Sequence, residues 1–145
     1  MKNSVFGLLA FVTACGSPPE GDPRHADVIV ESDGLRAAAT TATSWWYTAT
    51  GTEVAFNVVQ ACSPGHVCAR VHFGALASGD AGRTEYPVGH PESCDTTVSE
   101  ALRPALLSIT VAHELGHVLG LAHDDGVMTA AVDEASWALP SEWTE

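Results

Sequence analysis

Three histidines and a glutamate lie close together in the sequence HELGHVLGLAHD, which occupies positions 113–124. His113 and His117 are four residues apart, which on an α-helix places them about 40° apart around the axis and about 6 Å apart along it. Two imidazoles placed in this way can bind one metal ion. Glu114 adds a carboxylate that can accept a proton from a metal-bound water. The spacing therefore predicts a metal site with a proton acceptor beside it.

A third histidine completes the pattern only if the helix ends. His123 lies six residues after His117, so a continuous helix would turn it about 240° away. Gly120 lies between them and can adopt the left-handed conformation that ends helices. We therefore expect the helix to end at Gly120 and the chain to return His123 as a third ligand. Three protein ligands leave one position for water, which distinguishes a catalytic zinc site from a closed structural site.

The alternative is a buried helix whose histidines are merely packed and hydrogen-bonded. H-E-x-x-H alone is expected by chance in roughly one chain in forty of this composition. Requiring Gly120 and His123 at their positions lowers that frequency to about one in ten thousand. The pattern therefore favours a metal site.

The segment resembles the zinc signature of the metzincin metalloproteases, HExxHxxGxxH followed by a family-specific residue. A methionine turn follows in these proteins, and Met128 in the sequence GVM matches it. The sequence HELGHVLGL is most similar to that of bacterial matrixin-like proteins. The resemblance implies one catalytic Zn²⁺ bound by His113, His117 and His123. It also implies that Glu114 is the general base and acid, that Met128 forms a hydrophobic floor beneath the ion, and that the substrate is a protein or peptide.

The chain also departs from these families. Asp124 follows the third histidine where matrixins typically have serine and adamalysin-like enzymes have aspartate, and no Pro-x-Tyr segment follows Met128. Substrate-pocket residues are therefore not assigned. A proteolytically inactive, zinc-containing surface-binding lipoprotein is the alternative function, and a purely structural zinc domain is a third. The presence of Glu114 favours the endopeptidase.

The elements that must position this site fit one domain. The chain has 145 residues, of which 46% are hydrophobic and 17% charged, enough for a single core. Hydrophobic patterning predicts strands at 26–31, 53–59, 67–76, 83–88 and 96–102, and helices over 35–48 and from Pro104 onward. This order implies a sheet with helices packed on it. The resemblance implies an α+β, zincin/metzincin-like fold over residues 26–145, with a mostly parallel twisted sheet of four to five strands, two main helices and a short C-terminal subdomain.

The N-terminus has the features of an export signal. Residues 1–14 combine a basic start with a short apolar run and small residues before Cys15, which resembles the lipobox of bacterial lipoproteins. We expect lipidation at Cys15, a tether over residues 15–25, and a cell-envelope protein anchored to the membrane by lipid. An ordinary secretory signal and a secreted protein are the alternative. The net charge of -12 argues against nucleic-acid binding, and we expect a monomer.

Export makes disulfides feasible. Cys62 and Cys68 flank the turn signal Pro64-Gly65, and we favour a disulfide between them, although spacing alone does not fix connectivity. Cys94 is then left as a buried thiol or the partner of another group.

A second, structural zinc or calcium ion is a further expectation, because matrixin-like proteins often hold one. The ligands available to it are His72, His90, Asp80 and Asp95. Their spacing does not require such a site.

Overall fold

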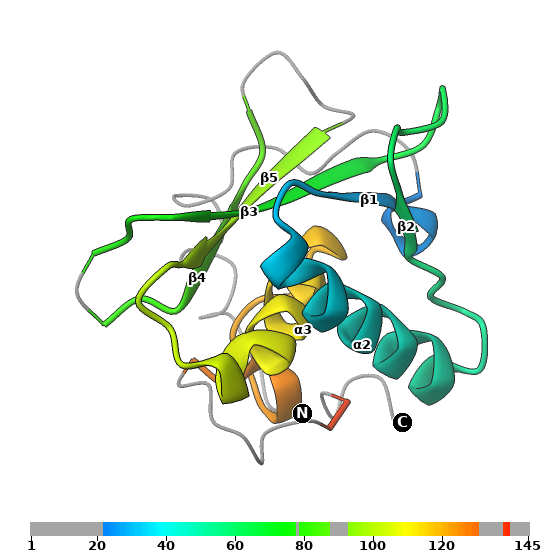
Figure 1. Cartoon of the computed structure of the whole chain (residues 1–145). Coiled ribbons are helices and arrows are strands. Elements are labelled where there is room, and N and C mark those ends of the chain that lie inside the picture. The colour runs from blue at the N-terminus through cyan, green and yellow to red at the C-terminus, as the bar shows by residue number, and fades with distance from the viewer. Residues whose placement is uncertain (1–21, 78, 88–92, 131–137, 140–145) are drawn as a thin grey trace.

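The computed structural model describes residues 22–77, 79–87, 93–130 and 138–139, and it contains a five-stranded sheet with two long helices on one face (Figure 1). The strands are β1 (Asp27–Val30), β2 (Asn57–Val59), β3 (Cys68–Gly74), β4 (Gly82–Glu85) and β5 (Ser93–Ser99). The helices are α2 (Asp33–Thr50) and α3 (Leu107–Val118), with short 3-10 turns η1 (Pro23–His25), η2 (Pro104–Leu106) and η3 (Gly126–Met128). The predicted α+β class with a mostly parallel sheet and two main helices is confirmed.

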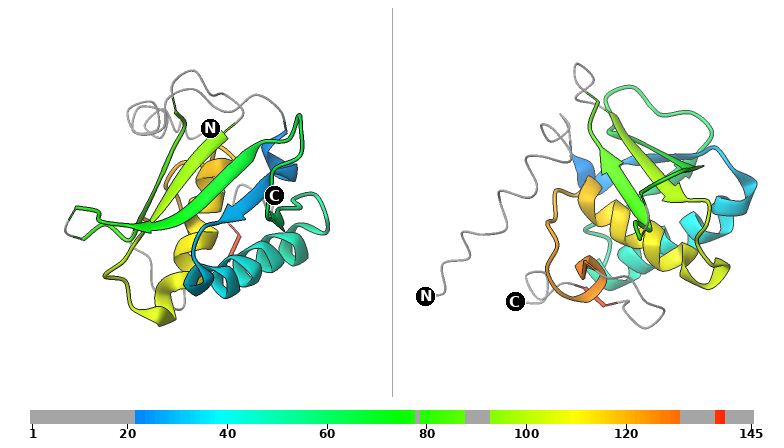
Figure 2. Two further views of the ribbon diagram at one scale, coloured as in Figure 1. Left: turned by 45° about the horizontal axis from the view of Figure 1, so that its top comes forward. Right: turned by 90° about the vertical axis from the view of Figure 1, so that its left-hand side faces the viewer.

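The sheet has the order β2-β1-β3-β5-β4, and only β4 runs antiparallel to its neighbour. Side chains alternate between its faces, so Cys94, Thr96 and Val98 of β5 are buried while the residues between them are partly exposed. The buried face is the one that α2 and α3 cover, as the two further views in Figure 2 show. The core therefore lies between one face of the sheet and the helix layer.

Helix α2 packs through one buried stripe that combines large and small residues. Leu35, Ala38, Ala42 and Trp46 are buried at spacings of three or four, which places them on one stripe of the helix. The Trp46 ring donates a hydrogen bond of 3.0 Å from Nε1 to the carbonyl of Ala112 in α3. This bond fixes α2 against the helix that carries the histidines.

Helix α3 is central to the core, and its residues from Ile109 to Gly116 are all buried. Pro104 begins the turn η2 rather than α3 itself, which starts three residues later. At the other end, the Tyr86 hydroxyl donates to the carbonyls of His117 and Val118 at 2.7 and 3.0 Å. Tyr86 thereby binds the carbonyl end of the helix, where carbonyls lack the usual partners within the helix.

Several predicted boundaries were wrong. Residues 53–56 are not a strand, because the Ala55 N–H bonds to the carbonyl of Arg24 and ladder pairing with β1 begins only at Asn57. The strand predicted at 96–102 occupies 93–99, because it pairs with β3 along the whole of that strand and the chain then turns. The helix predicted over 35–48 extends two residues further at each end, from Asp33 to Thr50.

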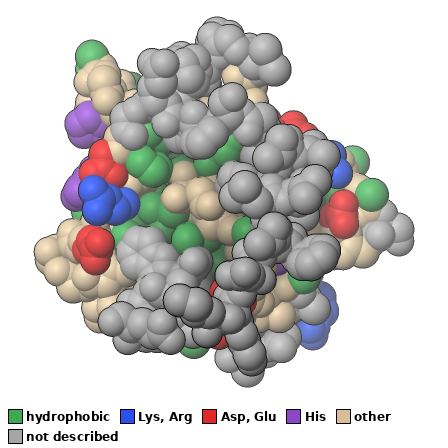
Figure 3. Space-filling view, turned by 180° about the vertical axis from the view of Figure 1, so that it is seen from behind, with side chains coloured by type: hydrophobic (Ala, Val, Ile, Leu, Met, Phe, Trp, Pro, Cys, Tyr) green, Lys and Arg blue, Asp and Glu red, His purple; other side chains and the backbone are tan. Residues whose placement is uncertain are grey.

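Several predicted features fall outside the described residues: the export signal with Cys15, the residue His90, and most of the C-terminal subdomain. Among the helices that are described, none combines the length and apolar character needed to cross a bilayer. Seen from behind, hydrophobic side chains gather in the middle of the visible face, while charged and histidine side chains lie toward its edges (Figure 3).

Candidate metal centre

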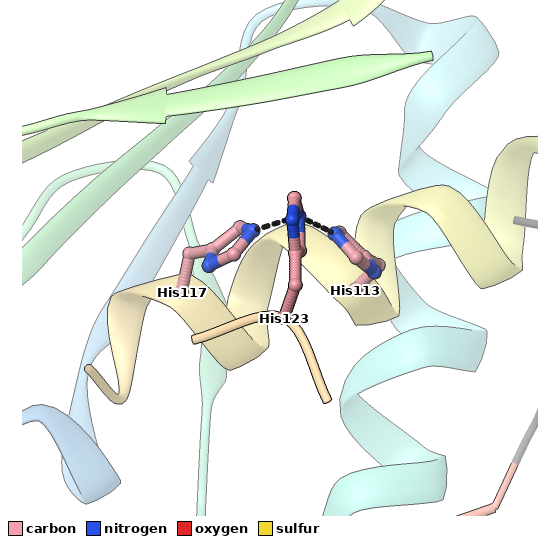
Figure 4. A group of neighbouring side chains, drawn as sticks. All are labelled: His113, His117 and His123. Atoms are coloured by element: carbon pink, nitrogen blue, oxygen red, sulfur yellow. Dashed lines mark hydrogen bonds between the residues drawn. The ribbon is translucent and has the colours of Figure 1, made fainter. Parts of the chain in front are cut away.

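The three histidines converge on one point (Figure 4). His113 and His117 project from α3, and His123 projects toward them from the segment that follows the helix. The Nε2 atom of His123 lies 3.2 Å from Nε2 of His113 and 3.2 Å from Nε2 of His117. Of the described residues that could ligate a metal, these three form the one group of this kind.

The chain reverses between the second and third histidines through a glycine turn. Gly120 has a φ of +87°, in the left-handed region that residues with a Cβ rarely adopt. Its N–H bonds to the carbonyl of His117 at 2.9 Å, and the N–H of Leu121 bonds to the carbonyl of Gly116 at 3.0 Å. This pair of bonds is the Schellman pattern of helix ends. It ends the helix and lets His123 return.

Backbone carbonyls fix the protonation pattern of the two helix histidines. His113 Nδ1 lies 2.7 Å from the carbonyl oxygen of Val127, and His117 Nδ1 lies 2.8 Å from that of Leu121. A carbonyl can only accept, so each Nδ1 carries the proton and donates it. In the neutral rings the lone pair is then on Nε2, which faces the centre of the group. This is how a metal-binding histidine is oriented by its surroundings.

The electrostatics favour neutral rings. Burial lowers the pKa of His113 to about 4, with a further contribution from His117. Burial likewise lowers the pKa of His117. A neutral His123 has a single N–H, so it could donate a hydrogen bond to Nε2 of His113 or of His117 but not to both. A metal ion at the centre can instead accept the lone pairs of all three neutral rings. The three histidines can therefore bind a metal ion.

Glu114 lies on the buried side of α3. It is 3% exposed, and Thr84 of β4 donates a hydrogen bond of 2.8 Å from Oγ1 to its Oε2. Burial raises the pKa of Glu114 to about 7, and the Thr84 hydrogen bond opposes that rise. Gly82 packs against the other oxygen so closely that an added Cβ would lie 2.6 Å from Oε1. The carboxylate is thus enclosed between α3 and the edge strand.

Met128 lies beneath the helix at η3. It is fully buried, and its sulfur contacts α3 at Gly116. Its neighbour Val127 supplies the carbonyl that orients His113. The Asp124 N–H bonds to the Met128 carbonyl at 2.9 Å, which closes the short loop that carries His123. Asp124 and Asp125 are exposed and are not part of the metal-binding group.

The remaining predicted sites lie elsewhere. Cys62 and Cys68 form a disulfide, and Cys94 is buried in β5 outside that bond.

Of the residues considered for a second metal, His72 contacts Asp95 at 3.0 Å. Asp80 instead pairs with Arg83. The described part of the chain brings no third ligand to the His72–Asp95 pair, and His90 lies outside it, so the second metal ion stays a prediction.

Sequence reasoning missed Thr84, Gly82 and Tyr86, which all reach α3 from β4 or the residue after it. The only available signal was the edge strand predicted at 83–88, which gives no register.

The chain matches no protein-family model, and a comparison with curated proteins yields no significant match.

Proposed function

We propose that this protein is a zinc-dependent endopeptidase of the metzincin type, with the matrixin-like arrangement of ligands. The observation that carries the proposal is the convergence of three Nε2 atoms, two of them on rings that backbone carbonyls orient through Nδ1. Zinc binds imidazole nitrogen at about 2.0–2.1 Å in tetrahedral geometry, which separates two ligand nitrogens by about 3.3 Å. The two Nε2 separations of 3.2 Å fit that spacing.

The proposed chemistry divides between the ion and Glu114. Zinc, when bound, polarises the scissile carbonyl and lowers the pKa of a coordinated water. Glu114 would accept a proton at its carboxylate from the attacking water and would later deliver it to the leaving amine. The position of Glu114 next to His113 in the sequence, and its enclosure by β4, support this role.

An extended peptide is the substrate that the fold favours. β4 is the last strand in the described sheet, it runs antiparallel to β5, and it lies against α3. A peptide can pair with the open edge of such a strand and be held by backbone hydrogen bonds. This arrangement supports an endopeptidase rather than an enzyme for small substrates.

The proposal is tested by metal analysis of the purified protein together with cleavage of a peptide library. We expect about one zinc per chain, cleavage that stops with a chelator and returns with zinc, and loss of cleavage in Glu114→Gln with zinc content unchanged. Cleavage that survives chelation, or full activity in Glu114→Gln, refutes the mechanism. Tight zinc binding without cleavage by the unaltered protein supports the surface-binding alternative instead. Unfolding on chelation, again without cleavage, supports a structural zinc domain.

A further inference from the structure

A buried chain of hydroxyl groups leads from the sheet to Glu114. Thr96 of β5 and Thr84 of β4 are opposite each other in the antiparallel register, and their Oγ1 atoms are 2.9 Å apart. Thr84 Oγ1 is in turn 2.8 Å from Glu114 Oε2. All three side chains are at most 3% exposed. They form a connected polar group inside an otherwise apolar interface between the sheet and α3.

The direction of these hydrogen bonds follows from the chemistry of the groups. When Glu114 is ionised its carboxylate can only accept, and the single hydroxyl proton of Thr84 then points at Oε2, which is 2.8 Å away, rather than at the Glu114 carbonyl oxygen, which is 3.3 Å away. The Thr84 oxygen is then an acceptor for the hydroxyl of Thr96. Each hydrogen bond polarises the next, so the Thr84 hydroxyl becomes a better donor to the carboxylate when it accepts a hydrogen bond from Thr96.

Gly82 restricts the carboxylate from its other side. The ideal Cβ built at Gly82 would lie 2.6 Å from Oε1, 2.8 Å from Cγ and 2.9 Å from Cδ of Glu114. The backbone of β4 therefore packs along the Glu114 side chain, in a space that any other residue would fill. Two positions of the same strand thus act on the two oxygens: Thr84 binds Oε2 and Gly82 lies against Oε1.

We propose that Thr84 is a positioning residue for the reaction: its hydroxyl, supported by Thr96, holds Oε2 of Glu114 and so keeps the carboxylate in the place from which it accepts and returns the proton. This inference rests on the proposed function. It predicts an effect on the chemical step rather than on peptide binding, because Thr84 acts on Glu114 and not on the peptide. Loss of the hydrogen bond leaves a buried carboxylate without that partner and free to take other positions.

The test compares Thr84→Val, which replaces the hydroxyl with a methyl of the same shape, with Thr84→Ser, which keeps the hydroxyl. We expect kcat of Thr84→Val to fall about 10- to 100-fold with KM changed less than about twofold. Thr84→Ser keeps kcat within about threefold of the unaltered protein. Thr97→Val is the matched control: Thr97 is the next residue of β5, it faces the other side of the sheet, and we expect its kcat and KM to stay unchanged.

Thr96→Val serves as the second variant if Thr84→Val does not fold. It removes only the support behind Thr84, and we expect kcat to fall about two- to threefold. Zinc content is measured for every variant and is expected to stay at the level of the unaltered protein. An unchanged kcat in Thr84→Val, or equal falls in Thr84→Val and Thr84→Ser, overturns the proposal.

A structural readout separates this proposal from the proposed function. Crystal structures of the metal-free unaltered protein and of metal-free Thr84→Val are compared at Glu114. We expect the carboxylate to leave its place beside Gly82 in the variant, and an unmoved carboxylate overturns the positioning role. If the unaltered protein binds zinc without cleaving peptides, the proposed function fails, while this comparison still decides whether Thr84 holds Glu114.

Discussion

A methyl group added at Gly116 has no room in the folded protein. An ideal Cβ there lies 2.2 Å from the sulfur of Met128, 3.1 Å from its terminal carbon and 3.4 Å from Cζ2 of Trp46. The sulfur has to withdraw by about 1.2 Å to reach 3.4 Å, where ordinary contact begins. Met128 is fully buried, so its withdrawal displaces other side chains as well.

Two effects on stability oppose each other in Gly116→Ala. Alanine is favoured over glycine in a helix interior by about 1 kcal/mol. Overpacking a core costs about 1–3 kcal/mol, and the flexibility of methionine reduces that cost without removing it. Because the required movement exceeds an ångström and every neighbour is buried, the steric effect is the larger. We expect the free energy of unfolding of the metal-free protein to fall by about 1–2 kcal/mol.

The same change should weaken metal binding. Met128 follows Val127, whose carbonyl orients the His113 ring, so displacement of η3 loosens a hydrogen bond behind a metal ligand. Loss of such a bond lowers metal affinity about 10- to 100-fold, and we expect Gly116→Ala to fall at the lower end of that range. Urea unfolding gives the stability, and competition with a chromophoric chelator gives the zinc affinity.

The control is Gly34→Ala, at the start of α2. An ideal Cβ at Gly34 lies 3.4 Å from Cε2 of Phe73, which is ordinary contact, and the backbone is helical. We expect its stability to stay within about 0.5 kcal/mol of the unaltered protein. If Gly116→Ala matched Gly34→Ala in both stability and zinc affinity, the reasoning about the packing of Met128 would be refuted.

Three further predictions concern other parts of the molecule. Gly120→Ala meets no neighbour within 4 Å, so its backbone strain alone should cost about 1–2 kcal/mol in urea unfolding and lower zinc affinity by the chelator assay; unchanged values would show that the turn is not strained. Burial lowers the pKa of His72, but the hydrogen bonds to Asp95 and to the Phe73 carbonyl, together with the charges of Asp95 and Glu31, outweigh burial and raise the pKa overall. These interactions therefore stabilise the fold below pH 6.5, and their contribution is lost as the pH rises through the raised pKa. Thermal melts should therefore separate His72→Asn from the unaltered protein more at about pH 5.5 than at about pH 8.5, and a larger gap at the higher pH would contradict the assignment. Replacing both Cys62 and Cys68 with serine opens a link between residues six apart and should reduce stability by about 2 kcal/mol in urea, with zinc content unchanged because neither residue contacts the metal-binding group.

Local rules accounted for much of the fold and of the metal-binding group. The spacing of Leu35, Ala38, Ala42 and Trp46 identified α2, because a helix that covers a sheet must bury one stripe. The position of Gly120 between two histidines indicated the end of α3, because a left-handed residue is needed there. Both inferences depend only on residues a few positions apart.

Features that depend on pairing between distant segments could not be predicted in the same way. Thr84 reaches Glu114 across thirty residues, and it faces α3 only because the antiparallel register sets it opposite Thr96. A shift of one residue in that register would turn Arg83 or Glu85 toward the helix instead. Nothing in the local sequence of β4 fixes this choice, so Thr84 and Gly82 had no sequence signal as parts of the site.

The metal-binding group also depends on residues that follow it. The N–H of Val127 bonds to the carbonyl of Ala138 at 2.8 Å, and an added Cβ at Gly126 would lie 2.6 Å from the same oxygen. The backbone at Ala138 therefore packs against η3 and holds the segment whose carbonyl orients His113. The position of His113 on α3 thus depends on Ala138, which lies 25 residues further along the chain. Local sequence can place the metal-binding atoms on one helix and one turn, but the rotation of the His113 ring depends on the Val127 carbonyl, whose residue bonds to the distant Ala138.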